Sequence, residues 1–186
     1  MKNLNHIVED YIKHHRKNAE KELRWFAIQK SLKETVSLAA LAQGPSRKRL
    51  SHQRRIPKSV LQKGKTKLLG NLSKMQNAKS FDNLHELIET IIGSIFGIGE
   101  LMIYDTALRI GAKLKLEPTS VYLHAGTRSG AKKIGIYSSK KKVEIKYIPK
   151  PLRKLKAHEI EDVLCIYKNS FNTQWVSNQS YTTCYG

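Results

Sequence analysis

The residues between Pro45 and Lys58 suit contact with phosphate groups. Six of them are Lys or Arg, and none is Asp or Glu. Lysine and arginine release counterions from a phosphate backbone, and the neighbouring hydroxyl and amide groups can donate further hydrogen bonds. The pattern predicts a phosphate clamp, with a flexible or nuclear-localisation-like run as the alternative. The predicted binding residues are Arg47, Lys48, Arg49, Arg54, Arg55 and Lys58.

Two glycine-containing segments farther along the chain could hold phosphate through backbone N–H groups. The first is the turn Gly97-Ile98-Gly99, whose glycines permit a tight bend at the start of a helix. Ile98 is expected to point inward and fix this turn to the core. The second is residues 126–133, whose spacing is not that of a P-loop; a plain Gly-rich connection is the alternative. The predicted contacts are Gly97 and Gly99 in the first, and Arg128, Lys132 and Lys133 in the second.

The stretch from Leu87 to Gly99 resembles the helix-hairpin-helix family of DNA-binding elements, in which a Gly-hydrophobic-Gly turn joins two short helices. The resemblance implies a turn whose backbone holds a phosphate without reading the base sequence. No Lys or Arg lies between residues 80 and 108, and Glu100 directly follows the turn. Arg109 and Lys113 are therefore predicted to supply the compensating positive charge.

A fainter similarity, over residues 84–130 at most, extends to the helix-hairpin-helix DNA glycosylases. Thr106-Ala107 lies about one helical turn later than the Thr-Ala pair of that family. The family's Val-Asp-Thr-His motif aligns with Val121-Tyr122-Leu123-His124, so a tyrosine stands where the catalytic carboxylate is expected. Leu101 stands where some members carry a lyase lysine. The resemblance therefore implies a DNA-binding scaffold rather than a base-excising enzyme.

The charge of the whole chain also favours a polyanionic partner. Among 186 residues, 34 are Lys or Arg and 15 are Asp or Glu, which gives a formal net charge of +19. Residues 35–81 hold eleven basic and no acidic side chains, and residues 106–156 hold fourteen basic and two acidic ones. A surface selected for stability alone mixes both signs, because like charges repel. We therefore expect a nucleic-acid partner, with DNA favoured over RNA; a solubilising basic surface is the alternative.

Other kinds of chemistry find less support in the sequence. The chain has two cysteines, Cys165 and Cys184, which argues against a Cys-based zinc finger and a disulfide scaffold. No His-x3-His spacing occurs, so we expect no metal, no cofactor and no catalytic residue. One alternative is a divergent glycosylase or nuclease that uses Asp105, Glu117 or His124. Another is a basic subunit of a larger nucleoprotein complex, with the N-terminal helix as its protein contact.

The elements expected to position these residues are mainly helical. Apolar residues at three- and four-residue steps predict helices at residues 4–42, 80–95, 101–114 and 157–169, and Pro57 could open a weaker one. The first is either one long helix or two with a bend. Val143, Ile145 and Tyr147 alternate with other residues and predict a strand. The predicted fold is mainly α: a helix-hairpin-helix core, a long N-terminal helix and a small β element near residues 134–148.

The expected organisation begins with an N-terminal helical region, residues 1–80, that contains the basic segment. A helix-hairpin-helix domain with a C-terminal helix follows at 81–171, and residues 172–186 form a tail. No apolar run is long enough for a membrane span, and Met1 to Asp10 lack the apolar core of a signal peptide. We therefore expect a cytoplasmic protein without a membrane partner, associated with the nucleoid if it binds DNA.

Overall fold

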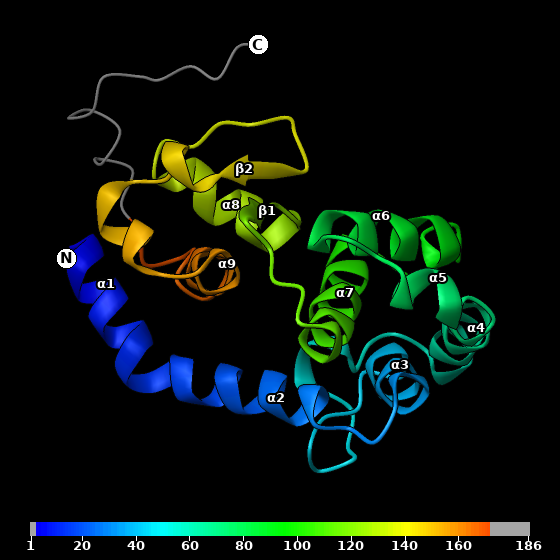
Figure 1. Ribbon diagram of the computed structural model, residues 1–186. Coiled ribbons are helices and arrows are strands. Elements are labelled where there is room, and N and C mark those ends of the chain that lie inside the picture. The colour runs from blue at the N-terminus through cyan, green and yellow to red at the C-terminus, as the bar shows by residue number, and fades with distance from the viewer. Residues whose placement is uncertain (1–2, 172–186) are drawn as a thin grey trace. The chain divides into compact units, whose positions relative to one another are not determined.

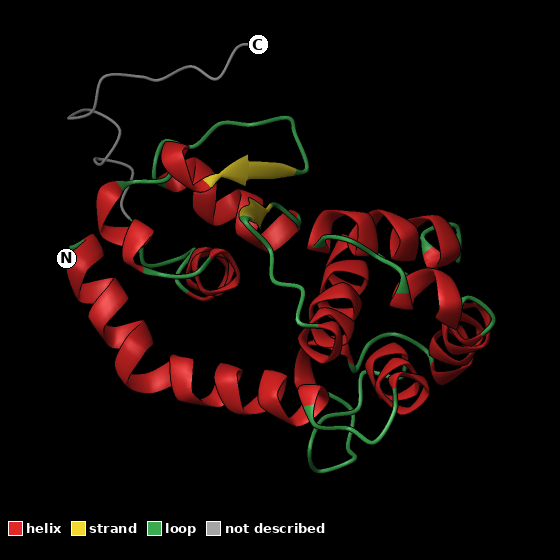
Figure 2. Ribbon diagram, viewed as in Figure 1, coloured by secondary structure: helices red, strands yellow, loops and turns green. Residues whose placement is uncertain are grey.

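The computed structural model describes residues 3–171, which form a mainly helical protein with a small two-stranded antiparallel sheet (Figures 1 and 2). The predicted tail at 172–186 lies outside the described residues. The chain divides into two compact units: unit 1 is formed by the residues up to Lys17 and from Thr119 onward, and unit 2 by Asn18–Pro118. The domain boundary expected at residue 80 thus falls inside unit 2. Among the described residues, no helix is long and apolar enough to cross a membrane.

The N-terminal helical region is interrupted. Its elements are α1 (Leu4–Tyr11), a π-helical turn (Ile12–Arg16), α2 (Lys17–Ala27) and α3 (Leu32–Ala40). The break before α3 has a local cause, because Ser31 is extended and its hydroxyl accepts a hydrogen bond from the Glu34 backbone N–H at 3.1 Å. A serine in this position starts a new helix. The predicted helical character is confirmed, and the break at Ser31 rules out one long helix and agrees with the alternative of separate helices.

Unit 2 is a bundle of helices. After α3 it contains α4 (Lys58–Leu69), α5 (Leu72–Gln76), α6 (Phe81–Ile92) and α7 (Glu100–Leu114). Both α4 and α7 pack on α3 and α6. The periodic apolar side chains are buried in this bundle, among them Val36, Leu61, Ile88 and Ile110. The helices predicted after Pro57, at 80–95 and at 101–114 are therefore confirmed, with small shifts at their ends.

Unit 1 combines α1 with the C-terminal part of the described chain. β1 (Ser120–Tyr122) pairs antiparallel with β2 (Lys142–Glu144), and α8 (Ala125–Lys133) packs on α9 (Ala157–Ile166). The predicted strand is shorter than expected, because Ile145–Tyr147 form a 3₁₀ turn. The two helices approach closely at Gly130, where a side chain would overlap the carbonyl oxygen of Leu164. Residues 126–133 are thus part of a packed helix and not a loop.

Polar side chains join the N-terminal residues of unit 1 to α9. Arg16 donates to both carboxylate oxygens of Glu159, at 2.6 and 3.2 Å. The buried Tyr11 hydroxyl donates to Asp162 at 2.8 Å. Burial and the neighbouring Asp162 raise the pKa of Tyr11, so the hydroxyl keeps its proton and remains a donor. These contacts place α9 against α1 and so fix the helix that carries Glu161 and Cys165.

Candidate nucleic-acid interface

A tight turn at residues 93–99 joins α6 to α7, and two of its glycines, Gly97 and Gly99, differ in what they require. Gly97 has a φ of +94°, a left-handed conformation that disfavours any residue with a Cβ. Gly99 has a φ of −102°, and a methyl group there would meet nothing within 4 Å. Ile98 is only 8% exposed, which confirms that it points inward. Gly97 and Ile98 therefore fix the turn, while Gly99 leaves the start of α7 open.

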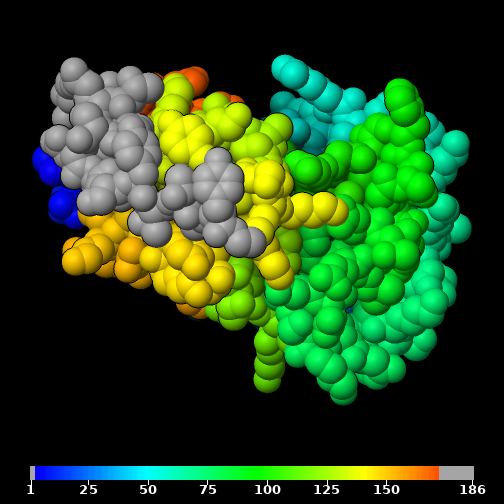
Figure 3. Space-filling view, turned by 90° about the horizontal axis from the view of Figure 1, so that it is seen from above, coloured from blue at the N-terminus to red at the C-terminus, as the bar shows by residue number. Residues whose placement is uncertain are grey.

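α4 lies directly against this turn, since a methyl group at Gly64 would come within 3.3 Å of Ile98 Cδ1. Beside this contact, α4 exposes cations and polar groups at four-residue steps. Lys63 and Lys67 line an open groove of about 670 Å³ together with Ile95 and Phe96 from the turn. The ring of Phe96 is 98% exposed. Figure 3 shows residues of α4 and α5 (teal) adjoining those of α6 and the turn (green) on one face.

The basic loop between α3 and α4 is shaped by two of its own arginines. Arg49 donates to the carbonyl oxygens of Arg54 and Ile56, at 3.2 and 2.7 Å. Arg47 lies 3.4 Å from a Glu34 oxygen and over the ring of Trp25. The other four cations of the loop are exposed and form no side-chain hydrogen bond or ion pair among the described residues. These are Lys48, Arg54, Arg55 and Lys58.

A polar network ties this loop to α7. Asp105 Oδ2 accepts a hydrogen bond from Gln53 at 2.6 Å and lies 2.8 Å from His52 Nε2. Arg109, which is 3% exposed, donates to Gln53 at 3.0 Å, to Glu22 at 3.1 Å and to Asp105 at 3.4 Å. The hydrogen bond to Asp105 raises the pKa of His52 and outweighs its desolvation. His52 and Gln53 therefore fix the loop to α7, a few residues ahead of the start of α4.

Three predicted phosphate ligands already bind the protein's own oxygen atoms. Arg109 belongs to the buried network just described. Lys113 donates to the carbonyl oxygens of Ala27 and Gln29, at 3.2 and 2.5 Å, and so closes the end of α2. Arg128 donates to backbone carbonyls of residues 123 and 138, at 2.7 and 3.0 Å. In unit 1, Lys132 is exposed and Lys133 half-buried on α8. Arg109 and Lys113 are thus engaged within unit 2, and the other three residues belong to unit 1.

Sequence reasoning did not single out Lys63, Lys67 or Phe96, which line this groove. The four-residue spacing of the two lysines was a usable signal, because it places both on one side of a helix. Nothing in the sequence distinguishes Phe96 from a core residue, since apolar positions flank it on both sides. Its exposure follows from the turn, in which Ile98 and not Phe96 faces the core.

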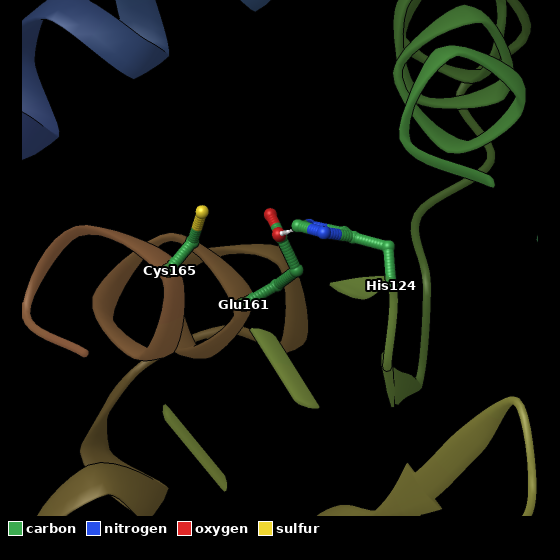
Figure 4. Close-up of side chains that lie close together, drawn as sticks. All are labelled: His124, Glu161 and Cys165. Atoms are coloured by element: carbon green, nitrogen blue, oxygen red, sulfur yellow. Dashed lines mark hydrogen bonds and ion pairs between the residues drawn. The ribbon is translucent and has the colours of Figure 1, made fainter. Parts of the chain in front are cut away.

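A second polar cluster lies in unit 1, where α8 begins beside α9 (Figure 4). His124 precedes α8, and Glu161 and Cys165 lie on α9. His124 Nε2 forms a hydrogen bond with Glu161 Oε1. The Thr127 hydroxyl lies 2.7 Å from His124 Nε2 and 2.8 Å from Glu161 Oε1. The sequence singled out His124 without its partners, because 37 residues separate it from Glu161. The alternative of a divergent glycosylase or nuclease named Asp105, Glu117 and His124. His124 belongs to unit 1, whereas Asp105 and Glu117 belong to unit 2.

No family model, no curated protein and no solved structure matches this chain. Its function must therefore be argued from the surface of unit 2 and from the cluster in unit 1.

Proposed function

We propose that the protein binds double-stranded DNA without sequence specificity and that unit 2 supplies the interface. The observation that carries the proposal is the set of exposed cations on the loop and α4, of which Lys63 and Lys67 line a groove with the exposed ring of Phe96. These residues together are named the basic face. It comprises Lys48, Arg54, Arg55, Lys58, Lys63, Lys67 and Phe96.

The cations of the basic face are available to phosphate. None forms a side-chain ion pair among the described residues, so none has to leave a protein partner before it binds. The loop leads directly into α4, so Arg54 and Arg55 are followed by Lys58 at the helix start and then by Lys63 and Lys67. If each of the six cations neutralises one phosphate, log affinity falls against log salt with a slope of about −5.

Phe96 favours nucleic acid over a polyanion that lacks rings. An aromatic side chain that is 98% exposed gains nothing from the protein core. Beside phosphate-binding cations, such a ring can wedge between base pairs or stack on a base. Both contacts tolerate any base, because every base offers a flat face. Phosphate contacts likewise carry no sequence information, so the whole surface suits nonspecific binding.

The turn between α6 and α7 is proposed to act as the hairpin of a helix-hairpin-helix element, as the resemblance implies. Left-handed Gly97 and buried Ile98 support this role, and no side chain caps the first N–H groups of α7. The positive end of the helix dipole adds to their attraction for phosphate. Glu100 is exposed at the first position of α7, and its negative charge repels a phosphate there. Glu100→Gln should therefore tighten DNA binding.

The test is fluorescence anisotropy with labelled duplexes of unrelated sequence over a range of salt concentrations. Lys63→Gln/Lys67→Gln should weaken binding to all duplexes alike and reduce the salt slope by about 2. The matched control is Lys21→Gln/Lys30→Gln, which removes the same charge from exposed positions elsewhere in unit 2. Phe96→Ala should weaken binding by about 1–3 kcal/mol and leave the salt slope unchanged.

Three results would refute the proposal. Equal losses in the two double-lysine variants would reveal a general effect of net charge. Losses that depend on the duplex sequence would contradict nonspecific binding. Tighter binding to an RNA duplex of the same sequence and length would contradict the preference for DNA.

A further inference from the structure

We infer that His124, Glu161 and Cys165 form a binding site for Zn²⁺ or a similar borderline divalent metal ion. The site lies within unit 1, so it stands independently of the proposed DNA binding by unit 2. One potential ligand atom from each residue lies within 4.8 Å of the other two. Zn²⁺ accepts all three kinds of donor, and tetrahedral Zn²⁺ holds its ligand atoms about 3.3–3.8 Å apart. Small side-chain shifts would therefore complete the site.

Two packed helices hold the three donors in position. Glu161 and Cys165 are four residues apart on α9 and therefore share one side of that helix. Figure 4 shows His124 reaching toward Glu161 from the start of α8. Gly126 makes room for this approach, since a Cβ there would lie 2.9 Å from Cys165 Sγ and 3.5 Å from His124 Cε1. The donors thus belong to a rigid part of the fold, as a preformed metal site requires.

The hydrogen-bonding atoms of the cluster outnumber its protons. His124 Nε2, Glu161 Oε1 and Thr127 Oγ1 form a triangle in which every pair is within hydrogen-bonding distance. An Nε2–H tautomer and the threonine hydroxyl supply two protons for three sides, and the other neutral tautomer supplies one. With Nε2–H, one proton must be shared between two sides, and with the other tautomer the Nε2 lone pair faces the carboxylate directly. A cation removes this shortage of protons, because it accepts lone pairs from nitrogen and oxygen at once.

Burial and charge also suit a divalent ion. His124 is 4% exposed and Glu161 is 5% exposed, and a buried carboxylate needs a compensating positive charge. A thiolate, a carboxylate and a neutral imidazole together neutralise a divalent cation. The sulfur ligand favours Zn²⁺ over Mg²⁺ or Ca²⁺, which prefer oxygen. Three protein ligands leave a fourth position for water or the Thr127 hydroxyl. Cys165 is only partly buried, so an ion can enter from the sulfur side.

The experiment is a Co²⁺ titration of the full chain after removal of bound metal with a chelator. Co²⁺ replaces Zn²⁺ in such sites, and a bond to thiolate gives a charge-transfer absorption that can be followed directly. We expect one Co²⁺ per chain and loss of this absorption when Zn²⁺ is added. Cys165→Ser should abolish the absorption, and Glu161→Gln should weaken binding by at least about tenfold. The matched control is Cys184→Ser, which removes the other cysteine and should leave the absorption intact.

A second measurement keeps the result interpretable. Zn²⁺ should slow the alkylation of Cys165 by iodoacetamide, as followed by mass spectrometry, and should raise the Tm of the wild-type chain but not of Cys165→Ser. Circular dichroism of each metal-free variant must first show wild-type helix content. The inference is overturned if the folded wild-type chain gives no thiolate charge transfer at saturating Co²⁺. It is also overturned if Cys165→Ser retains the absorption. Neither result would affect the DNA-binding test, which depends on unit 2.

Discussion

Arg109→Met should destabilise unit 2 and should not remove a direct phosphate contact. The guanidinium is 3% exposed and joins α7 to Glu22 and to Gln53 of the basic loop. Methionine is apolar and shorter than arginine, so it ends before the position of the guanidinium, which lies 5.7 Å from the ring of Phe26. The substitution therefore removes the polar contacts of Arg109 and its contact with this ring, and it leaves a shorter apolar side chain in its place.

The expected loss follows from the three hydrogen bonds of Arg109. A bond to a charged group contributes about 1.5–3 kcal/mol and a neutral one about 1 kcal/mol. All three bonds have the charged guanidinium as donor, although Gln53 is a neutral acceptor and the contact with Asp105 is long at 3.4 Å. Glu22 is 29% exposed, so water can partly replace Arg109 as its partner. The low value for each charged bond, reduced for this length and this exposure, gives a loss of about 3–4 kcal/mol, within the range for breaking a buried pair on one side.

Urea unfolding followed by the fluorescence of Trp25 measures this loss. A Trp175→Phe background leaves Trp25, which lies in unit 2, as the only tryptophan of the chain. Lys67→Gln is the matched control, because it removes an exposed cation and should change stability by less than about 0.5 kcal/mol. DNA affinity is then compared where all variants are folded. Unchanged stability of Arg109→Met with a selective loss of DNA binding would refute the reasoning and restore Arg109 as a phosphate ligand.

The helices were predictable because their signal is local. Apolar residues at three- and four-residue steps fix which side of a helix is buried, as Leu84, Ile88 and Ile92 of α6 show. The same reasoning did not predict the helix α8 in the segment after Gly126. Its glycines suggested a loop, but Gly130 is needed where α8 meets the backbone of α9. That contact joins residues more than thirty positions apart, and no local pattern records it.

The candidate sites differ in the same way: local features could be predicted from the sequence, and contacts between distant segments could not. The exposed loop cations were predictable from composition, since a run without carboxylates has few local partners. Arg109 was not, because its acceptors come from α2 and the basic loop. The cluster of His124, Glu161 and Cys165 was equally hidden, since only the packing of α8 on α9 brings the three together. Metal-ligand spacing rules detect sites within one element and miss a site shared between two.

The remaining predictions concern the turn and the loop. Gly97→Ala should lower the free energy of unfolding by about 1–2 kcal/mol, because Gly97 has a φ of +94°. Gly99→Ala should leave it unchanged, and equal urea midpoints for the two variants would contradict this distinction. The last prediction is a pH dependence that belongs to His52. Its hydrogen bond to Asp105 raises the folded-state pKa above the ordinary value of about 6.5. The folded state therefore binds the proton more tightly than the unfolded state does, and the resulting stabilisation is complete below the unfolded pKa. It is lost as the pH rises through the folded pKa. The difference in unfolding free energy between wild type and His52→Gln should thus be largest in mild acid and shrink as the pH rises through the folded pKa of His52. A His52→Gln difference that is constant with pH would mean that the Asp105 contact does not favour the protonated imidazole.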